Sequence, residues 1–129
     1  MVIDTSALLA IFLAEPERKA LLDLITRAET RYISTANVFE TGIVLEARRR
    51  EAPGREFEFL HDVKLEVVPA DLEQVEVARV AWRKYGKDRH RSGLNFEDCF
   101  AYALAKVTGE PVLFKAHDFV HTDIPPAIT

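Results

Sequence analysis

The sequence has only one cysteine, Cys99, in 129 residues. A single cysteine cannot form an internal disulfide, which excludes a small disulfide-stabilised secreted scaffold and suits a reducing compartment. Long hydrophobic runs are also missing: the longest, 7–14, falls far short of the roughly 20 residues that span a membrane. No basic segment precedes the apolar start, so we expect no signal peptide and a cytoplasmic location.

The chain lacks an excess of positive charge. It has 17 Lys and Arg against 21 Asp and Glu, a formal net charge of −4. Nonspecific nucleic-acid binders usually carry a basic face, so this balance weighs weakly against that class. It does not exclude a nucleic-acid enzyme, because a metal ion bound by several of the acids would offset their charge. The length predicts a single domain over residues 1–129.

Strand-like and helical segments alternate along the chain. Short apolar runs predict strands at 1–4, 32–33, 65–69 and 111–114. Apolar periodicity and capping residues predict helices at about 7–12, 16–28, 35–50, 57–63, 71–86 and 95–109. This alternation predicts an α/β fold with a mostly parallel central sheet flanked by helices. Ligands bind such sheets beyond the carboxyl ends of the strands.

Four acidic residues occupy positions that are unfavourable for a carboxylate. Asp4 ends the first strand, Glu40 interrupts the apolar stripe of a helix, and Asp98 opens a helix that is apolar almost all round. Asp118 follows the last strand. Two unit charges about 4 Å apart repel by roughly 4 kcal/mol at an effective dielectric near 20, so converging acids require a cation. Oxygen donors favour Mg²⁺ or Mn²⁺ over zinc.

Each of these residues also has a structural interpretation. Asp4 could cap the helix that follows it. Asp98 fits a capping box with Asn95, and Asp118 could be a turn residue. Glu40 is the most telling, because its neighbours one helical turn away are apolar and an ordinary surface glutamate would lie on the opposite face.

Four motifs in the chain carry a family resemblance. They are VIDTSA at 2–7, TANVFET at 35–41, GLNFEDCFAYALA at 93–105 and the segment 113–124. In this order they resemble the motifs of PIN-domain ribonucleases, specifically the VapC-type toxins of bacterial toxin–antitoxin pairs. The resemblance covers the whole chain. It implies a PIN-like three-layer fold and a Mg²⁺- or Mn²⁺-dependent endoribonuclease that hydrolyses RNA phosphodiester bonds.

The resemblance also implies partners and site residues. It implies a homodimer and a cognate VapB-like antitoxin whose C-terminal segment covers the active site. It assigns a supporting hydroxyl to Ser6. The family's catalytic and metal-binding acids correspond to Asp4, Glu40, Asp98 and Asp118.

The chain departs from the family pattern at two places. Glu97 stands where many relatives have glycine, so it either adds a charge beside the site or faces solvent. Ala116 and His117 stand where glycine and a small polar or acidic residue are common, which puts the presentation of Asp118 in question.

The RNA must also be held. We expect contacts from the polar loop that precedes the Asp98 helix, through Lys87, Arg89 and Arg91, although such a loop could simply be solvated. Single-stranded RNA is the expected substrate form, because unstacked bases can be read directly. We expect Cys99 to be a core residue and not a nucleophile.

Other classes fit the sequence less well. The main alternative is a catalytically silent PIN-like module that only binds a protein partner. A phosphatase of the haloacid dehalogenase type requires a second aspartate two residues after Asp4, where this chain has Ser6. A flap-type DNA nuclease carries larger insertions than 129 residues accommodate.

Overall fold

The computed structural model describes residues 1–48, 53–115 and 119–127. Every predicted strand and helix is present, with ends that differ by a residue or two, as helix ends commonly do. The strands are β1 (Val2–Ile3), β2 (Tyr32–Ser34), β3 (Glu66–Val68) and β4 (Val112–Leu113). The helices are α1 (Thr5–Phe12), α2 (Arg18–Arg27), α3 (Thr35–Arg48), α4 (Arg55–Asp62), α5 (Leu72–Tyr85) and α6 (Phe96–Thr108).

The four strands form one parallel sheet in the order β3-β2-β1-β4. Parallel neighbours require crossover connections, and the helices between successive strands supply them. The carboxyl ends of β1 and β4 lie side by side, since the Asp4 N–H donates a hydrogen bond to the Leu113 carbonyl at 2.9 Å. The edge of the sheet where ligands are expected therefore begins at Asp4.

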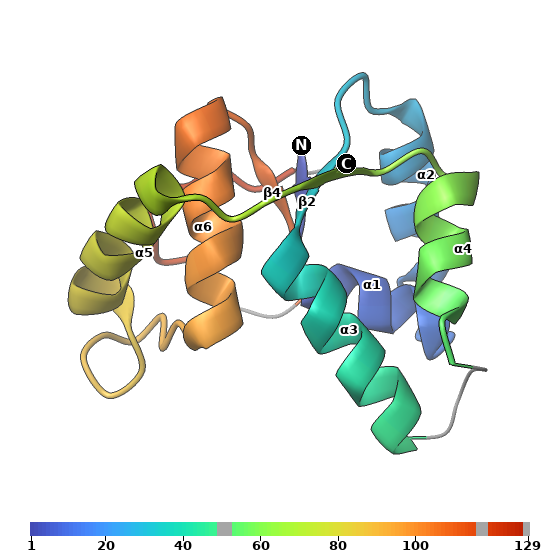
Figure 1. Ribbon diagram of the computed structural model, residues 1–129, viewed down its shortest axis with the longest axis horizontal. Coiled ribbons are helices and arrows are strands. Elements are labelled where there is room, and N and C mark those ends of the chain that lie inside the picture. The colour runs from blue at the N-terminus through green and yellow to red at the C-terminus, as the bar shows by residue number, and fades with distance from the viewer. Residues whose placement is uncertain (49–52, 116–118, 128–129) are drawn as a thin grey trace.

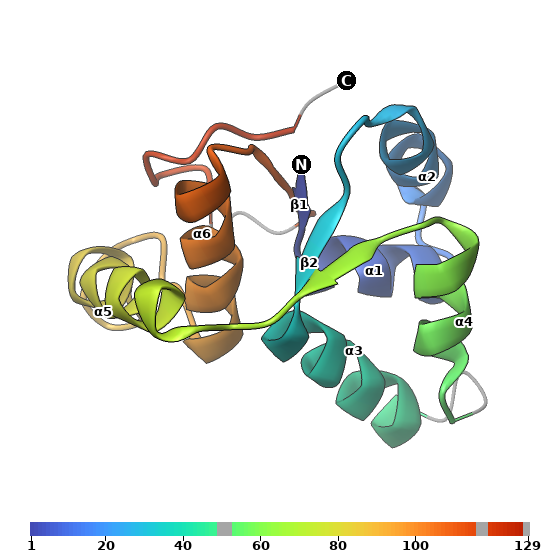
Figure 2. The same ribbon diagram turned by 45° about the horizontal axis from the view of Figure 1, so that its top comes forward.

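Two apolar cores cover the two faces of the sheet. Val2 and Val112 pack against α5 and α6 on one face. Ile3 and Leu113, the next residues along the same strands, pack against α1, α2 and α4 on the other. This alternation follows from the two-residue period of a strand. Figures 1 and 2 show the two groups of helices on opposite sides of the strands, which confirms the predicted three-layer α/β fold.

Helix α6 is the most apolar part of the larger core. Residues 101–105 are all buried, as the sequence predicted for a helix that is apolar almost all round. Gly109 ends the helix at a φ of +73°, a left-handed conformation that glycine adopts without strain. Within the described ranges, neither α6 nor any other helix is long and apolar enough to cross a membrane.

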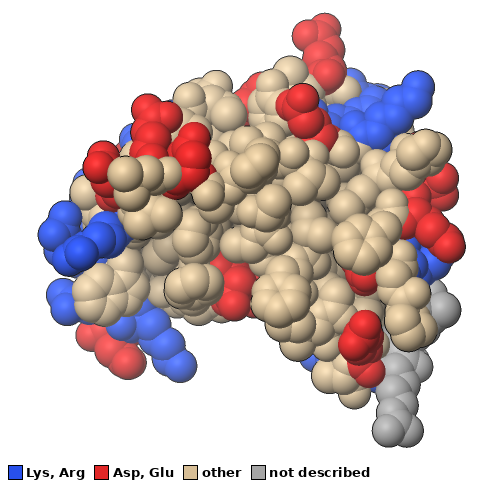
Figure 3. Space-filling view, viewed as in Figure 1, with Lys and Arg blue, Asp and Glu red and all other residues tan. Residues whose placement is uncertain are grey.

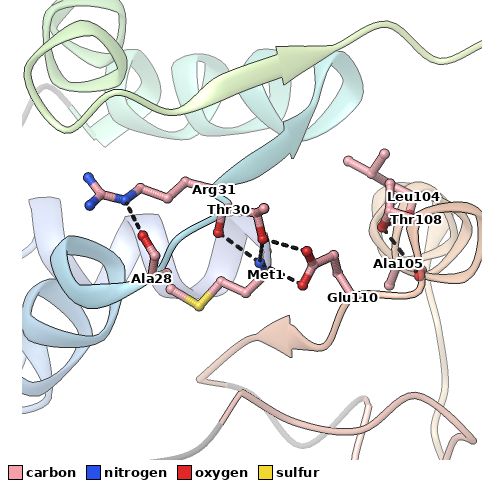
Figure 4. A network of polar contacts seen from close by, with 8 residues as sticks. All are labelled: Met1, Ala28, Thr30, Arg31, Leu104, Ala105, Thr108 and Glu110. Carbon is pink, nitrogen blue, oxygen red and sulfur yellow. Dashed lines mark hydrogen bonds and ion pairs between the residues drawn. The ribbon is translucent and has the colours of Figure 1, made fainter.

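A polar network ties the amino end of β1 to two loops (Figure 4). The Met1 amino group donates hydrogen bonds to the carbonyl and hydroxyl of Thr30 at 2.8 and 2.9 Å, and pairs with the Glu110 carboxylate at 3.0 Å. The Thr30 hydroxyl also donates to Glu110. This hydrogen bond, helped by the amino group, lowers the pKa of Glu110. The network fixes the sheet edge opposite the expected site.

Candidate active site

Three of the four predicted acids line one pocket. The pocket lies at the carboxyl end of β1, where the first turns of α1 and α6 meet the middle of α3. Figure 3 shows acidic side chains between α6 and α3, near the centre of a face whose other charged side chains, of both signs, lie mostly around its edge. Asp118 lies outside the described residues, so its predicted place is not tested. The lining residues are Asp4, Thr5, Ser6, Leu9, Glu40, Val44, Asn95 and Asp98.

Asp4 is both a helix cap and a pocket residue. It is the N-cap of α1, and its Oδ2 accepts a hydrogen bond from the Ser6 N–H at 3.0 Å. It is almost completely buried. The positive end of the α1 dipole stabilises its negative charge. The structural interpretation of Asp4 is therefore correct, and it leaves the residue in position to contribute to a site.

Asp98 is likewise both a capping residue and a pocket residue. Its Oδ2 accepts a hydrogen bond from the Asn95 N–H at 3.0 Å, and its own N–H donates to the Asn95 Oδ1 at 2.9 Å, which completes the predicted capping box. Asp98 is buried at the N-terminus of α6. The pocket thus collects the N-termini of two helices, an arrangement that favours bound negative charge.

Glu40 is the acid most perturbed by the site. Burial raises the pKa of Glu40 to about 7, and the neighbouring carboxylates of Glu97 and Asp4 add to the effect. A hydrogen bond with Thr5 acts in the opposite direction. Such a value means that the ionised form of Glu40 is poorly stabilised where it lies, because burial removes its hydration and the neighbouring acids repel its charge.

Glu97 belongs to this acidic cluster. Its side chain interacts with that of Glu40, which decides between the two interpretations offered by the sequence in favour of an added charge beside the site. The interaction of Glu97 with Glu40 could not be read from the sequence, because the two residues come from different helices. The available signal was its place next to Asp98.

Asn37 is a positioning residue that the sequence did not single out. It is fully buried in α3, and its Nδ2 donates a hydrogen bond to the Thr5 hydroxyl at 2.9 Å and a longer one to the Glu97 carbonyl at 3.5 Å. Asn37 therefore links α3 to the first turns of α1 and α6, the elements that carry the three acids. The signal in the sequence was an amide one helical turn before Glu40 on the same apolar face.

Ser6 links the pocket to the end of β4. Its hydroxyl accepts a hydrogen bond from the Lys115 N–H at 2.9 Å. The Lys115 ammonium pairs with Glu15 and, at 3.6 Å, with Glu17. Ser6 thus holds Lys115, the last described residue before 116–118, against the start of α1. Ser6 lies next to Asp4 in the pocket, and its supporting role stays a prediction.

The predicted RNA-binding residues lie on a closed loop. Gly86 and Leu94 form a bridge at its base, with the Lys87 N–H donating to the Leu94 carbonyl at 2.9 Å. All three predicted cations, Lys87, Arg89 and Arg91, are exposed. The Arg89 guanidinium lies 4.1 Å from the centre of the Trp82 ring, a cation–π contact. The loop leads directly into Asn95, the cap of α6.

Cys99 packs in the core against α5. It is 5% exposed, and burial raises the pKa of its thiol to about 11, with Asp98 and Glu97 adding to the effect. A thiol with that pKa is protonated at neutral pH and is a weak nucleophile. This agrees with the prediction that Cys99 is a core residue.

The donor chemistry of the pocket fits a hard divalent cation. Its charged residues are all carboxylates and its remaining polar groups are hydroxyl and amide oxygens, the ligand types of Mg²⁺ and Mn²⁺. Among the described residues, no three His, Cys, Asp or Glu side chains stand close enough to hold an ion together.

Comparisons with known proteins agree with the fold and the motifs. The model of the PIN domain family matches residues 1–125. A ribonuclease VapC of Mycolicibacterium smegmatis is 50% identical over 96% of this chain and 97% of its own length. Ribonuclease VapC30 of Mycobacterium tuberculosis is 48% identical over 96% and 95%.

Solved structures show the same fold at much lower sequence identity. A toxin–antitoxin complex from Klebsiella pneumoniae has a TM-score of 0.71 at 15% identity, covering 95% of this chain and 92% of that one. The Mycobacterium tuberculosis toxin VapC20, described as cleaving the sarcin–ricin loop, has a TM-score of 0.71 at 17% identity and 95% coverage of both chains. The chain therefore belongs to the PIN-domain family, among the VapC ribonucleases of toxin–antitoxin systems.

Proposed function

We propose that this single-domain PIN protein is a toxin that cleaves RNA endonucleolytically with Mg²⁺ or Mn²⁺. The observation that supports it best is the pocket where Asp4, Glu40 and Asp98 meet beside two helix N-termini. Asp4 and Asp98 would hold the ion, with Glu40 and Asp118 completing the site and Ser6 supporting it. When bound, such an ion activates water and neutralises charge on the phosphate.

The residues of the chain supply positioning and proton transfer. Asp4 and Asp98 are fixed by their capping hydrogen bonds, so little side-chain freedom remains to be lost when a ligand binds. Glu40 would take the proton released by the attacking water, because its carboxylate lines the same pocket as Asp4 and Asp98. Hydrolysis of this kind leaves a 5′-phosphate and a 3′-hydroxyl, and needs no nucleophile from the protein.

The partners follow from the same proposal. The RNA backbone would approach along the exposed loop cations Lys87, Arg89 and Arg91, which precede the Asp98 helix. A cognate VapB-like antitoxin would inhibit the enzyme in the cytoplasm, and the toxin would act within a homodimer. The relatives named VapC and the toxin–antitoxin complex with the same fold support an antitoxin partner.

Cleavage of total RNA by the purified chain, free of antitoxin, tests the proposal. The reaction is run with magnesium, with manganese and with chelator, beside Asp98→Asn. Glu73→Gln, which removes an exposed acid from the first turn of α5, is the matched control. We expect discrete fragments that require the metal, persist in the control and disappear with Asp98→Asn.

A silent binding module remains the second candidate. The observation in its favour is that the described residues do not by themselves gather three metal-ligating side chains. Calorimetric titration with Mn²⁺ separates the two functions. A folded chain that neither binds Mn²⁺ nor cuts RNA would be a binding module, whereas Mn²⁺ binding lost in Asp98→Asn would support the nuclease.

A further inference from the structure

A groove between α5 and α6 lies across α6 from the acidic pocket. Figure 1 shows α6 between α5 and α3, and the pocket lies on the α3 side. The groove has a volume of about 190 Å³, below the roughly 300–1,000 Å³ of pockets for drug-sized ligands, so it fits a single ring system. The residues that line it are Val75, Ala78, Arg79, Trp82, Phe96, Cys99 and Phe100.

Exposed aromatic rings border this α5–α6 groove. Phe96 is 71% exposed and Trp82 44%. The Phe96 ring packs edge-on against that of Phe100, with 5.2 Å between the ring centres. Large apolar side chains that gather on a surface mark a binding site, and open aromatic faces suit a flat ring that stacks on them. The lining of the groove therefore suits a planar, largely apolar group.

The charge around the groove is positive. Arg79 lines it, and among the described lining residues it is the only charged one. The Arg89 guanidinium stacks on the Trp82 ring, 4.1 Å from its centre. Neither arginine forms an ion pair with a carboxylate of the described chain. Further cations, Arg83 and Lys84, follow in the last turn of α5, so the surroundings favour a ligand that carries negative charge beside its planar group.

A nucleobase with its flanking phosphates combines these two properties. Proteins that bind single-stranded nucleic acids stack unpaired bases on aromatic rings and on arginine guanidinium planes, and place cations along the backbone. Arg89 over Trp82 supplies such a plane, and Arg79 lies one helical turn before Trp82. An apolar ligand or a protein side chain would satisfy the rings but not the arginines. RNA is thus the occupant that both the rings and the charge favour.

The first turn of α6 joins the groove to the acidic pocket. Asn95 and Asp98 line the pocket, while Phe96 and Cys99, the residues that follow each of them, line the groove. The two hollows are therefore separated by the width of one helix, about 10 Å. A single strand that crosses the N-terminal end of α6 would place a phosphate at the acids and a nearby base in the groove.

We propose that the α5–α6 groove binds one unpaired nucleobase that flanks the cleaved phosphate of the RNA substrate. This rests on the proposed function, because it takes the acidic pocket as the place of cleavage. Trp82 and Phe96 provide the stacking surfaces, and Arg79 and Arg89 contact the neighbouring phosphates. The described lining residues include no carboxylate or amide side chain to read a base edge. The groove therefore selects unpaired over paired RNA, and the larger purine ring over a pyrimidine, by stacking.

The fluorescence of Trp82, the only tryptophan of the chain, tests this base site. The full chain is titrated in chelator with a short oligoadenylate and with an abasic ribose phosphodiester of the same length. We expect only the oligoadenylate to quench the emission, because only a base can stack. Phe96→Ala should weaken oligoadenylate binding about fivefold or more, and Phe96→Tyr should keep the affinity. Phe57→Ala, which removes a comparably exposed ring from α4, should bind as the wild type does.

Three outcomes would overturn the base site. Two of them are equal quenching by the two strands and an oligoadenylate affinity that folded Phe96→Ala leaves unchanged. The third is Trp82 emission that shifts with protein concentration before RNA is added and then ignores oligoadenylate, because the groove would then hold a second copy of the chain. Metal-dependent cleavage of total RNA tests the proposed function separately: cleavage without quenching contradicts only the base site, and quenching without cleavage contradicts the nuclease.

Discussion

Glu40 and Glu110 are the same residue type at opposite edges of one sheet, and their surroundings push them in opposite directions. At the amino edge, Glu110 has the Thr30 hydroxyl and the Met1 amino group beside it, and its pKa is lowered. At the carboxyl edge, Glu40 is partly buried among Glu97 and Asp4, and its pKa is raised to about 7. At the amino edge, the contacts of Glu110 stabilise the fold. At the other edge, burial and the neighbouring acids leave the ionised form of Glu40 poorly stabilised.

The largest expected effect comes from substituting Asp98, which lines the acidic pocket at the carboxyl edge of the sheet. Asp98→Asn keeps a side-chain oxygen that can serve the capping box but removes the charge that is proposed to hold the metal. If the proposed function holds, metal-dependent cleavage of RNA should fall by about a hundredfold or more. The thermal midpoint should change little, because the asparagine Oδ1 can still accept the hydrogen bond from the Asn95 N–H at the N3 position of the capping box. Cleavage at an unchanged rate by folded Asp98→Asn would remove the residue from the site.

Substitution of Asn37 should weaken the contacts between α3 and the first turns of α1 and α6. Asn37→Ala removes its hydrogen bonds to Thr5 and Glu97 inside the protein, and we expect the free energy of unfolding to fall by about 2 kcal/mol. Urea denaturation measures this loss. The control is Thr26→Ala, which removes only an exposed hydrogen bond to the Asp23 carbonyl. Equal, small changes in the two variants would contradict the positioning role of Asn37.

Neutralising Glu40 should stabilise the metal-free protein, because it removes a charge that is unfavourable at the carboxyl edge of the sheet. Because the folded pKa is raised above the unfolded value, ionised Glu40 destabilises the fold increasingly as the pH rises from about 4.5 to about 7. Glu40→Gln should therefore stabilise the chelated protein by about 1 kcal/mol at slightly alkaline pH, a figure reduced for solvent screening. The difference should vanish in acid. Stabilisation that does not vary with pH would refute the electrostatic cause.

The smallest effect is expected at the amino edge of the sheet, where Glu110 has the Thr30 hydroxyl and the Met1 amino group as partners. Glu110→Gln should lower the free energy of unfolding by about 0.5–1 kcal/mol, the usual range for a partly exposed ion pair. The Glu110 contribution is present above the unfolded pKa of a glutamate and is lost as the pH falls through its lower folded pKa. Thermal denaturation over an acidic pH series should show the wild type and variant converging at low pH. Above that pH Glu110→Gln should be less stable than the wild type, whereas Glu40→Gln should be more stable.

Much of the molecule follows from its local sequence. Apolar periodicity and capping residues placed the helices, and Asp4 and Asp98 follow directly from a strand end and a capping box. The positive φ of Gly109 follows from its place at the end of an apolar helix. The motifs led to the correct family, because they sit on elements whose order brings strand ends together. The catalytic and metal-binding roles of the four acids, and the roles of the other predicted site residues, remain predictions: Asp4, Glu40, Asp98, Asp118, Ser6, Lys87, Arg89 and Arg91.

Contacts between elements distant in sequence could not be read from the chain. The interaction of Glu97 with Glu40, the hydrogen bond from Asn37 to Thr5 and the burial of Glu56 against Gly42 each join two different helices. Their existence depends on how α1, α3, α4 and α6 pack, which no local propensity encodes. The sequence by itself determined which acids the protein has and which elements carry them. Only the tertiary structure decided their electrostatic environment, because pKa and burial depend on neighbours that folding supplies.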